Sequence, residues 1–452
     1  MIDTQAIRSK ILNLAMRGQL TEQYENETVD FVDEVSANAP YSVPSNWKWV
    51  KLASIITKDV GGGTPSKSVE EYWKNGTIPW MSVKDFSSAK NGILEDTIDH
   101  ITQAGLENSA SNLIDVNAII VCMRMALGKI VKLKRPMAIN QDLRAIWLNK
   151  CVDRDYFVFY YSTLKVEGYG MTVAGINKKQ LMAYMMPLPP LAEQQRIVEK
   201  IGQVFSVLDT IDALQARHAD NLAALKAKLI DAAIRGKLTE QLPQDGTAEE
   251  LYQHIQAEKQ ALIKAGKIRK EKPLPEVTPK EAPFDIPANW KWVRVGSVAE
   301  VASGTTPKAI ELSSAGTIPY FKVSDMNVPG NETYMNHAIN FITDGYAGKI
   351  FPAGTTIFPK NGGAALTNKR RILTIPSAVD LNTGGCTPVI GEMARWIKLF
   401  METVDFGRMD TGSNIPTVNA TNLKKRLMVL PPLAEQQRIV ARLDEVLKII
   451  EQ

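Results

Sequence analysis

The stretch Leu188-Pro-Pro-Leu-Ala-Glu-Gln-Gln-Arg-Ile-Val198 opens the longest helical pattern in the chain, and the same letters recur at residues 430–440. Between residues 191 and 235 there is no proline and only one glycine. Apolar side chains return there about every 3.5 residues, which is typical of a helix packed lengthwise against another helix. Such a helix reaches roughly 65 Å, which favours a spacer over an amphipathic helix on one globular core. Its seam consists of Ile197, Ile201, Val204, Leu208, Ile211, Gln215, His218, Leu222, Leu225, Leu229 and Ala232.

The second copy of this stretch is shorter, and the part that it lacks is found near the N-terminus. Ile234-Arg-Gly-Lys-Leu-Thr-Glu-Gln241 resembles Met16-Arg-Gly-Gln-Leu-Thr-Glu-Gln23. Laid end to end, the helical segments at residues 433–452 and 1–24 rebuild nearly the whole central helix. The sequence therefore predicts a circularly permuted repeat.

The composition is that of an ordinary globular protein. A chain of 452 residues is long enough for two to four domains, and its net charge of +4 permits a nucleic-acid partner without requiring one. The three cysteines, Cys122, Cys151 and Cys386, are widely scattered, so we expect neither a disulfide framework nor a zinc site. This cysteine usage suits a reducing compartment, and we expect the protein to be cytoplasmic. No apolar run approaches 18 residues and no signal-peptide pattern is seen, so we expect no membrane span.

Two globular segments repeat each other. Both open on Asn-Trp-Lys-Trp-Val, at residues 46–50 and 289–293. Gly76-Thr-Ile-Pro-Trp-Met-Ser-Val-Lys-Asp85 also matches Gly316-Thr-Ile-Pro-Tyr-Phe-Lys-Val-Ser-Asp325. Short β-rich runs alternate with Gly, Pro and Asn turns in both, which predicts an α+β or mainly β globule. The two segments keep the same repeated positions but differ in the residues between them, which indicates one scaffold that recognises two different targets.

These patterns divide the chain into six parts. Residues 242–285 hold a helical segment near Glu249–Ala265 and a Lys/Pro-rich stretch, which we expect to be a solvated, semi-rigid linker rather than a DNA-binding tail. The parts are residues 1–24 and 433–452, which share one helical region; the globules 43–190 and 286–432; the central helix 191–241; and the linker region 242–285.

No catalytic motif is found in the sequence. The loop Gly61-Gly62-Gly63-Thr64-Pro65 suits either a phosphate contact or a tight turn, since it lacks the order of a P-loop. Asp85 and Asp325 are isolated carboxylates, better explained as capping residues than as catalysts. There is no H-E-x-x-H, no G-x-S-x-G and no Asp/Asn-Pro-Pro-aromatic tetrapeptide of the kind that amino-methyltransferases use. We therefore expect a chain that is not itself an enzyme.

Basic residues beside predicted turns indicate recognition of a nucleic acid. Lysine and arginine in loops suit phosphate groups, and arginine and amides suit base edges, although any single one is often only a solvated charge. The candidate DNA-binding residues are Lys67, Lys84, Arg124, Lys129, Lys178 and Lys179 in the first globule and Lys308, Lys322, Lys360, Lys369, Arg370 and Arg371 in the second.

Two pairs of candidates occupy matching places in the repeats. Arg124 and Lys360 are the first choice for DNA contact, because the repeat alignment puts a positive charge at the same strand end in both globules. Trp80 and Tyr320 are also equivalent and could stack on a base, but packing beneath a sheet is the favoured interpretation.

Taken together, these segments resemble the specificity (S) subunit of a type I restriction–modification system. The resemblance rests on the P-x-N-W-K-W openings, the G-T-I-P-[WY]-x-x-V-x-D segments and the repeated L-P-P-L-A-E-Q-Q-R-I-V ends, and it covers essentially the whole chain. It implies an α+β protein with two globular target recognition domains joined by a long antiparallel coiled coil, with pseudo-two-fold symmetry. Each domain would read one half of a bipartite, asymmetric DNA site. Gln215 and His218 would face the place where the chain termini meet.

The resemblance also implies the partners. These are double-stranded DNA, two modification (methyltransferase) subunits, and restriction/translocase subunits. The chain itself would hold no cofactor, since S-adenosylmethionine, ATP and magnesium are expected on the partner subunits. Two alternatives stay open at this point: a protein–protein scaffold without DNA specificity, and a self-contained DNA methyltransferase or nuclease.

Overall fold

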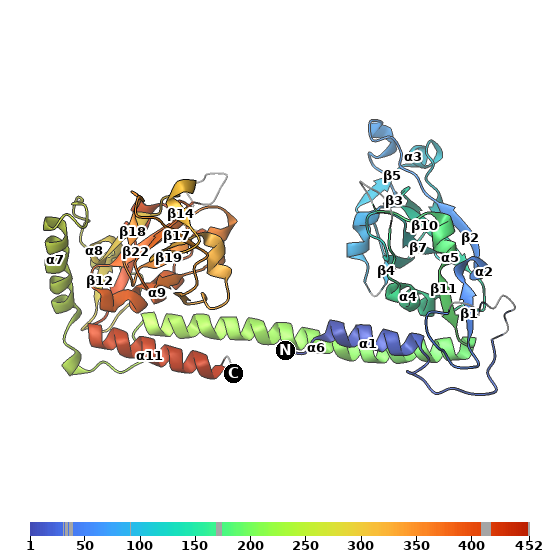
Figure 1. Ribbon diagram of the computed structural model, residues 1–452, viewed down its shortest axis with the longest axis horizontal. Coiled ribbons are helices and arrows are strands. Elements are labelled where there is room, and N and C mark those ends of the chain that lie inside the picture. Colours follow the sequence, from blue (N-terminus) through green and yellow to red (C-terminus); the bar gives the residue numbers. More distant parts are fainter. Residues whose placement is uncertain are drawn as a thin grey trace. The chain divides into compact units, whose positions relative to one another are not determined.

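Helix α6 (Leu191–Ile234) is one continuous helix of 44 residues, as the sequence predicts (Figure 1). The computed structural model describes residues 1–29, 31, 35, 39–90, 92–168, 174–407 and 417–450. The chain forms two compact units, Met1–Arg217 (unit 1) and His218–Gln452 (unit 2), and α6 contributes its first part to unit 1 and its last part to unit 2.

The seam of α6 is buried or half-buried toward both of its ends. Ile197 and Ile201 are fully buried in unit 1. The seam residues Leu229 and Ala232 are half-buried in unit 2, beside the fully buried Ala233. His218 and Leu225, which the heptad pattern also assigns to the seam, are exposed. Apolar spacing therefore predicts the helix correctly, but burial along it depends on what packs beside each turn.

In unit 1 the N-terminal helix α1 (Thr4–Met16) lies along the first part of α6 (Figure 1). Thr4 Oγ1 donates a 2.6 Å hydrogen bond to Asp212 Oδ1 at the start of α1. Ile2 N donates to Gln215 Oε1 (2.6 Å), and Gln215 Nε2 donates back to Ile2 O (3.2 Å). Gln215 therefore contacts the N-terminal end of the chain, which is one part of the expectation for Gln215 and His218, and the two helices run antiparallel.

A buried carboxylate ties the start of α6 to the first globule, and we call these contacts joint 1. Glu193 is fully buried; its carboxylate accepts hydrogen bonds from Trp47 Nε1 (2.7 Å) and Gln23 Nε2 (2.6 Å). Burial raises the pKa of Glu193 in spite of these donors. The neighbouring Gln194 donates to Pro189 O (2.9 Å). The repeated Leu-Pro-Pro-Leu-Ala-Glu-Gln-Gln motif is thus the connection between globule and helix.

Unit 2 repeats this connection with segments from other parts of the chain, and we call it joint 2. Helix α11 (Leu433–Ile450) packs antiparallel on the last part of α6. Its Glu435 is fully buried and accepts hydrogen bonds from Trp290 Nε1 (2.8 Å) and Gln241 Nε2 (2.9 Å). Gln436 Nε2 donates to Pro431 O (2.9 Å). Unit 1 therefore pairs α1 with α6 as unit 2 pairs α6 with α11, which confirms the predicted circular permutation.

Each globule contains a five-stranded sheet, a second sheet of four strands in unit 1 and five in unit 2, and a two-stranded pair that joins its beginning to its end. In unit 1 the orders are β2-β10-β7-β8-β4, β5-β3-β9-β6 and β1-β11. The strands are β1 (Lys48–Lys51), β2 (Ile56–Gly61), β3 (Ile78–Met81), β4 (Ile93–Leu94), β5 (Asp99–Ile101), β6 (Leu113–Ile114), β7 (Ile119–Cys122), β8 (Ile130–Leu133), β9 (Met137–Ile139), β10 (Leu143–Leu148) and β11 (Met185–Leu188). The helices are α2 (Leu52–Ile55), α3 (Gln103–Glu107), α4 (Arg154–Thr163) and α5 (Lys178–Ala183).

Unit 2 has the same topology with one added strand, β14. Its orders are β13-β22-β19-β20-β16, β14-β17-β15-β21-β18 and β12-β23. The strands are β12 (Lys291–Arg294), β13 (Ala299–Ser303), β14 (Leu312–Ser313), β15 (Ile318–Phe321), β16 (Tyr334–Met335), β17 (Asn340–Ile342), β18 (Ile350–Phe351), β19 (Thr356–Pro359), β20 (Arg371–Leu373), β21 (Ser377–Val379), β22 (Thr383–Pro388) and β23 (Leu427–Leu430). The helices are α7 (Ala248–Lys264), α8 (Val295–Val298), α9 (Ala394–Glu402) and α10 (Ala420–Lys425).

The central strand β7 explains why the core needs an unbroken apolar run. All four of its residues are buried. Ile119 and Val121 pack into the cluster that contains α4, whereas Ile120 and Cys122 pack into the cluster on the other face of the sheet. A strand covered on both faces cannot show the alternating pattern of a half-exposed strand.

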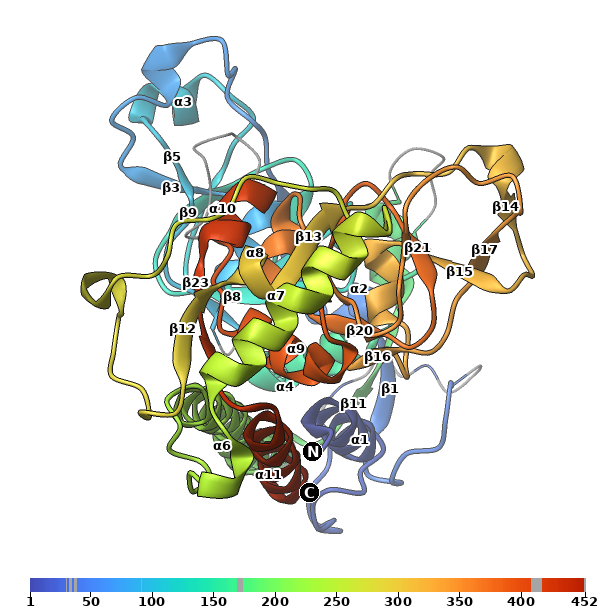
Figure 2. The same cartoon turned by 90° about the vertical axis from the view of Figure 1, so that its left-hand side faces the viewer.

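The Lys/Pro-rich stretch is exposed along most of its length, as expected of a solvated linker, and it is also held against unit 2 at several points. Helix α7 precedes it and lies over α8, where Ile255 is fully buried (Figure 2). Arg294 Nε donates to Pro275 O (2.7 Å), and Arg294 also pairs with Glu281 (2.7 Å). Glu271 pairs with Lys424 (2.5 Å). A run of charges and prolines does not reveal these partners, because they lie far away in the sequence.

Candidate nucleic-acid interface

The ends of several strands in unit 1 meet at one edge of the five-stranded sheet. Strand β10 runs antiparallel to both β2 and β7, so β2 and β7 end where β10 begins. Strand β8 starts at the same edge, and β3 ends beside it, since Asn140 N donates to Met81 O (2.9 Å). We call this edge rim 1, and its segments are residues 61–67, 82–85, 123–129, 140–142 and 175–179.

All six basic residues predicted in the first globule lie on rim 1 and are exposed. Lys67, Lys84, Lys129 and Lys179 form no ion pair with any residue in the described part of the chain. The two others, Arg124 and Lys178, pair with Asp142 (3.2 Å) and Asp59 (2.6 Å) respectively. Fold topology thus gathers charges that are spread over more than 100 residues of sequence, and the unpaired lysines suit phosphate groups.

An acidic residue on the strand that leads into rim 1 holds one cation of the rim and one of the neighbouring strand β10. Asp59 on β2 contacts both Lys178 and Arg144. Burial raises the pKa of Asp59, but the hydrogen bonds and charges of Lys178 and Arg144 outweigh it, so its pKa lies below the ordinary value. Asp59 therefore stays charged at neutral pH and holds Lys178 in place.

The equivalent edge of unit 2 is rim 2, where two of the predicted lysines are hydrogen-bonded to neutral side chains. Its segments are residues 303–308, 322–327, 360–371, 380–383 and 417–419. Lys308 and Lys322 are exposed. Lys360 donates to Ser303 Oγ (2.9 Å), and Lys369 donates to Asn327 Oδ1. Arg371 is half-buried and donates to backbone oxygens, so rim 2 presents more amide and hydroxyl groups than rim 1.

The prediction that Arg370 contacts DNA is wrong. Its side chain is buried, with 1% of its surface exposed. Its guanidinium donates to Met401 O (3.0 Å) and Val404 O (3.2 Å), and its centre lies 3.8 Å from that of the Phe406 ring. Burial lowers the pKa of Arg370 to about 10. It satisfies carbonyl groups at the end of α9, which helices leave without partners inside the helix.

The strand register also corrects the pairing of Arg124 with Lys360. Arg124 forms an isolated bridge with Gly175, and Asn361 forms the matching bridge with Thr417. Arg124 therefore corresponds to Asn361, and Lys360 lies one residue earlier. Sequence alignment placed two positive charges together, but adjacent residues of a strand point to opposite faces.

The paired aromatic and acidic residues are structural. Trp80 and Tyr320 are buried, and Trp80 Nε1 donates to Gly63 O (3.0 Å), which confirms that they pack beneath the sheet. Asp85 accepts from Ser82 N (2.7 Å), and Asp325 accepts from the backbone N–H three residues before it (2.8 Å). Both carboxylates therefore cap short helical turns, as expected.

The glycine-rich loop packs tightly against a neighbouring strand. A Cβ on Gly62 would lie 2.0 Å from Ile139 O, and one on Gly304 would lie 2.2 Å from Val379 O. These close approaches account for glycine at equivalent places in both units. They favour the tight-turn interpretation of this loop over a phosphate cradle.

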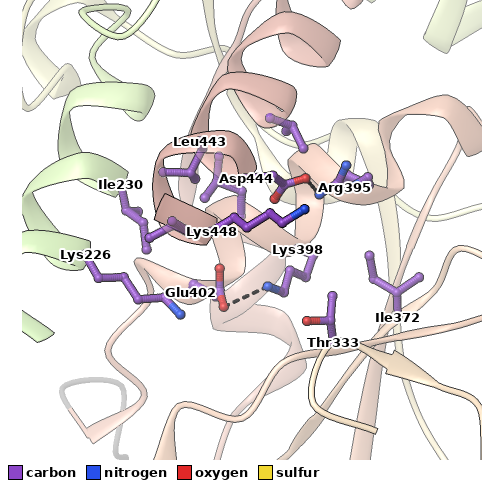
Figure 3. A pocket seen from close by; sticks show the side chains of 13 residues that line it. Lys226, Ile230, Thr333, Ile372, Arg395, Lys398, Glu402, Leu443, Asp444 and Lys448 are labelled. Carbon is purple, nitrogen blue, oxygen red and sulfur yellow. Dashed lines mark hydrogen bonds and ion pairs between the residues drawn. The ribbon is translucent and has the colours of Figure 1, made fainter. Parts of the chain in front are cut away.

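Unit 2 also has a pocket of about 430 Å³ between α6, α9 and α11 (Figure 3). Arg395 pairs with Asp444, and Lys398 pairs with Glu402 (2.9 Å). The corresponding region of unit 1 is filled by a ring contact between Phe159 and Phe205, with centroids 6.0 Å apart. In the unit 2 pocket, one ion pair joins α9 to α11 and the other lies within α9, so these four charged side chains are already paired. Among the described residues, no group of His, Cys, Asp or Glu could hold a metal ion.

Residues 44–217 and 287–452 both match the model of the type I restriction modification DNA specificity domain. The chain belongs to this family. The two matches coincide with the two repeats, which confirms the predicted resemblance and the fold class. The protein is therefore a specificity subunit, and its function is recognition of a DNA sequence within a type I restriction–modification system.

Known specificity subunits resemble this one over long stretches. The type I restriction enzyme EcoAI specificity subunit of Escherichia coli is 22% identical over 98% of this chain and 88% of its own. The EcoR124I/EcoR124II specificity subunit of Escherichia coli is 33% identical over 37% of this chain and 41% of its own. A solved chain from work on complex assembly and conformational transition of the type I R-M system shares the fold, with a TM-score of 0.58 and 18% identity, covering 91% of this chain and 93% of that one.

Sequence reasoning missed several polar residues on the rims of the specificity subunit. Asp142, Asn361 and Asn382 were not among the candidates, yet each lies where a strand meets a rim. Alignment of the strands by their buried residues, rather than by charge, could have identified Asn361. In the described chain no helix is long and apolar enough to cross a membrane.

Proposed function

We propose that the specificity subunit reads a bipartite DNA site with rim 1 on one half and rim 2 on the other. The observation that carries this proposal is the gathering of exposed basic residues at the same sheet edge in both units. Four lysines of each rim have no acidic partner among the described residues, so their charges are available to phosphate groups.

The two half-sites differ in sequence under this proposal. On rim 2 two of the lysines are hydrogen-bonded to neutral side chains, and amides and hydroxyl groups gather around Ser303, Asn361 and Asn382. Base edges are distinguished by such donor and acceptor patterns. A shared backbone frame with unlike side chains therefore suits an asymmetric target.

The chemistry of modification and cleavage belongs to partner subunits in this proposal. Two methyltransferase subunits dock on the paired helices and joints, and restriction/translocase subunits join them in the cytoplasm. S-adenosylmethionine, ATP and magnesium are bound by those partners, and this chain is not an enzyme. Joint 1 and joint 2 support this proposal, because the chain builds the same connection twice. It can therefore offer two similar surfaces to two copies of the same partner.

Methylome sequencing tests the proposal most directly. Cells that carry the modification subunit of this system would be compared with and without the specificity subunit. We expect methylated sites that share two short specific segments separated by an unread gap. A single contiguous motif, or methylation that does not depend on this chain, would contradict the proposal.

Salt dependence of DNA binding separates recognition from a scaffold role. A subunit that neutralises several phosphates loses affinity steeply as salt rises. Substitution of Lys84 by alanine should lower the slope of log affinity against log salt by about 1 if this lysine contacts one phosphate. A salt-independent affinity would favour a protein–protein scaffold instead.

A further inference from the structure

The two rims carry different side-chain pairs on identical backbone positions. In unit 1, Arg124 follows β7 and Asp142 precedes β10; their charged groups are 3.2 Å apart. In unit 2, Asn361 follows β19 and Asn382 precedes β22, and Asn361 Nδ2 donates to Asn382 Oδ1 at 3.0 Å. Each pair occupies the place where the central strand meets the rim.

Backbone hydrogen bonds show that these positions are equivalent. The residue before Arg124 donates its N–H to Asp142 O (2.8 Å). The residue before Asn361 donates its N–H to Asn382 O at the same distance of 2.8 Å. Both strand ends also form the isolated bridges described above. The repeats have therefore kept the backbone and exchanged an ion pair for an amide pair.

The surrounding residues hold Arg124 in one orientation. Asp142 is largely covered, with 12% of its side chain exposed, whereas 50% of the Arg124 side chain is exposed. Asn140 Nδ2 donates to Asp142 Oδ2 (3.4 Å), which anchors the carboxylate. A Cβ on Gly175 would lie 2.9 Å from Arg124 Cγ, so the arginine stem packs against bare backbone. One edge of the guanidinium is fixed, and the remaining N–H groups face solvent.

The Asn361 pair is anchored in a similar way. Asn382 Nδ2 donates to Asp380 Oδ2 (3.5 Å), and Thr383 Oγ1 donates to Asp380 Oδ1 (2.5 Å). Asn361 uses one Nδ2 hydrogen for Asn382. Its second Nδ2 hydrogen and its Oδ1 then form a donor–acceptor pair of the kind that matches an adenine edge.

We propose that this position selects one base in each half-site, with Arg124 reading a guanine and Asn361 reading an adenine in the major groove. The proposal rests on the function proposed above. Arginine bonds guanine O6 and N7 with two parallel N–H groups, and asparagine bonds adenine N6 and N7. Asp142 and Asn382 act as positioning residues that hold each reader.

The charge of each pair argues against a phosphate contact. Asp142 would repel a phosphate placed beside Arg124, whereas the edge of a base carries no net charge. The Asn361–Asn382 pair carries no positive charge to attract a phosphate. A site for uncharged base edges fits both pairs, while the unpaired lysines of rim 1 fit phosphates.

An exchange of the two pairs is the sharpest test. The double variant Arg124→Asn with Asp142→Asn installs the amide pair in unit 1, and Asn361→Arg with Asn382→Asp installs the ion pair in unit 2. Each full-length variant, produced with its modification subunit, would be bound to DNA in which every position of the site is randomised in turn. We expect unit 1 to change its preference from guanine to adenine at one position, and unit 2 to change from adenine to guanine.

The expected size of the effect is that of one bidentate base contact. Discrimination at the affected position should change by roughly 5- to 150-fold, while the other half-site keeps its preferences. The variant Arg124→Lys keeps the charge and removes the planar fork, so it should lose the guanine preference without loss of folding. Lys129→Asn is the matched control on rim 1, and it should weaken binding to all sequences alike.

The outcomes separate this inference from the proposed function. If the parent protein shows a bipartite preference and neither exchange alters a base within it, the inference is overturned and the function stands. Uniform weakening by Arg124→Lys, like that of the control, would make Arg124 a phosphate contact and would also overturn it. A parent protein without any bipartite preference would overturn the function itself.

Discussion

The substitution Glu193→Ala should weaken the docking of α1 on α6 indirectly, through the segment after α1 that contributes Gln23 to joint 1. Glu193 is fully buried and accepts two short hydrogen bonds, from Trp47 Nε1 (2.7 Å) and Gln23 Nε2 (2.6 Å). Hydrogen bonds to a charged group contribute about 1.5–3 kcal/mol each. Because burial raises the pKa of Glu193, part of this gain offsets the desolvation of the carboxylate. We therefore take the lower limit, and expect joint 1, and with it the docking of α1, to weaken by about 3 kcal/mol.

Hydrogen–deuterium exchange measures this loss locally. A change of about 3 kcal/mol corresponds to roughly a 150-fold rise in the open population, and amides of α1 should lose protection by that factor. Glu435→Ala is the matched control, since it removes the same carboxylate from joint 2 and should leave α1 protected. Less than a fivefold change in α1, or an equal change for both variants, would refute the role assigned to joint 1.

Three further changes probe other parts of the chain. Gly18 has a φ of +68°, and its Cβ would lie 2.3 Å from a proline ring carbon, so Gly18→Ala should lower the thermal midpoint whereas Gly202→Ala, with nothing within 4 Å, should not. The neighbouring cations lower the pKa of Asp59 in the folded protein, so the stability that Asp59 contributes is present above its unfolded-state pKa and is lost as pH falls through its folded-state pKa. Asp59→Asn should therefore make the free energy of unfolding depend less on pH in the acid range, and an unchanged pH dependence would argue against this. Arg370→Ala should destabilise unit 2 by about 2–4 kcal/mol without altering the salt slope of DNA binding, because its guanidinium is buried; an altered slope would return Arg370 to the DNA surface.

The sequence by itself determined the helices, the repeats and the family. A seam about every 3.5 residues is a local property, so the uninterrupted run 191–235 predicts α6 to within one residue, although the central helix was expected to reach residue 241. The Leu-Pro-Pro-Leu-Ala-Glu-Gln-Gln motif also occurs twice in the sequence. Comparison of the segments that follow the two copies revealed the permutation. The chemical reason for that motif, a buried glutamate that accepts from a tryptophan, became visible only in joint 1 and joint 2.

Only the tertiary structure decided which basic residues are available to DNA. Lys369, Arg370 and Arg371 are three adjacent cations, yet Arg370 alone is buried, because α9 ends over that side of β20. Likewise, Arg124 corresponds to Asn361 because strand pairing sets the register, and a shift of one residue reverses the direction of a side chain. The charge of a side chain can be read from the sequence, but its exposure depends on the neighbours that folding brings beside it.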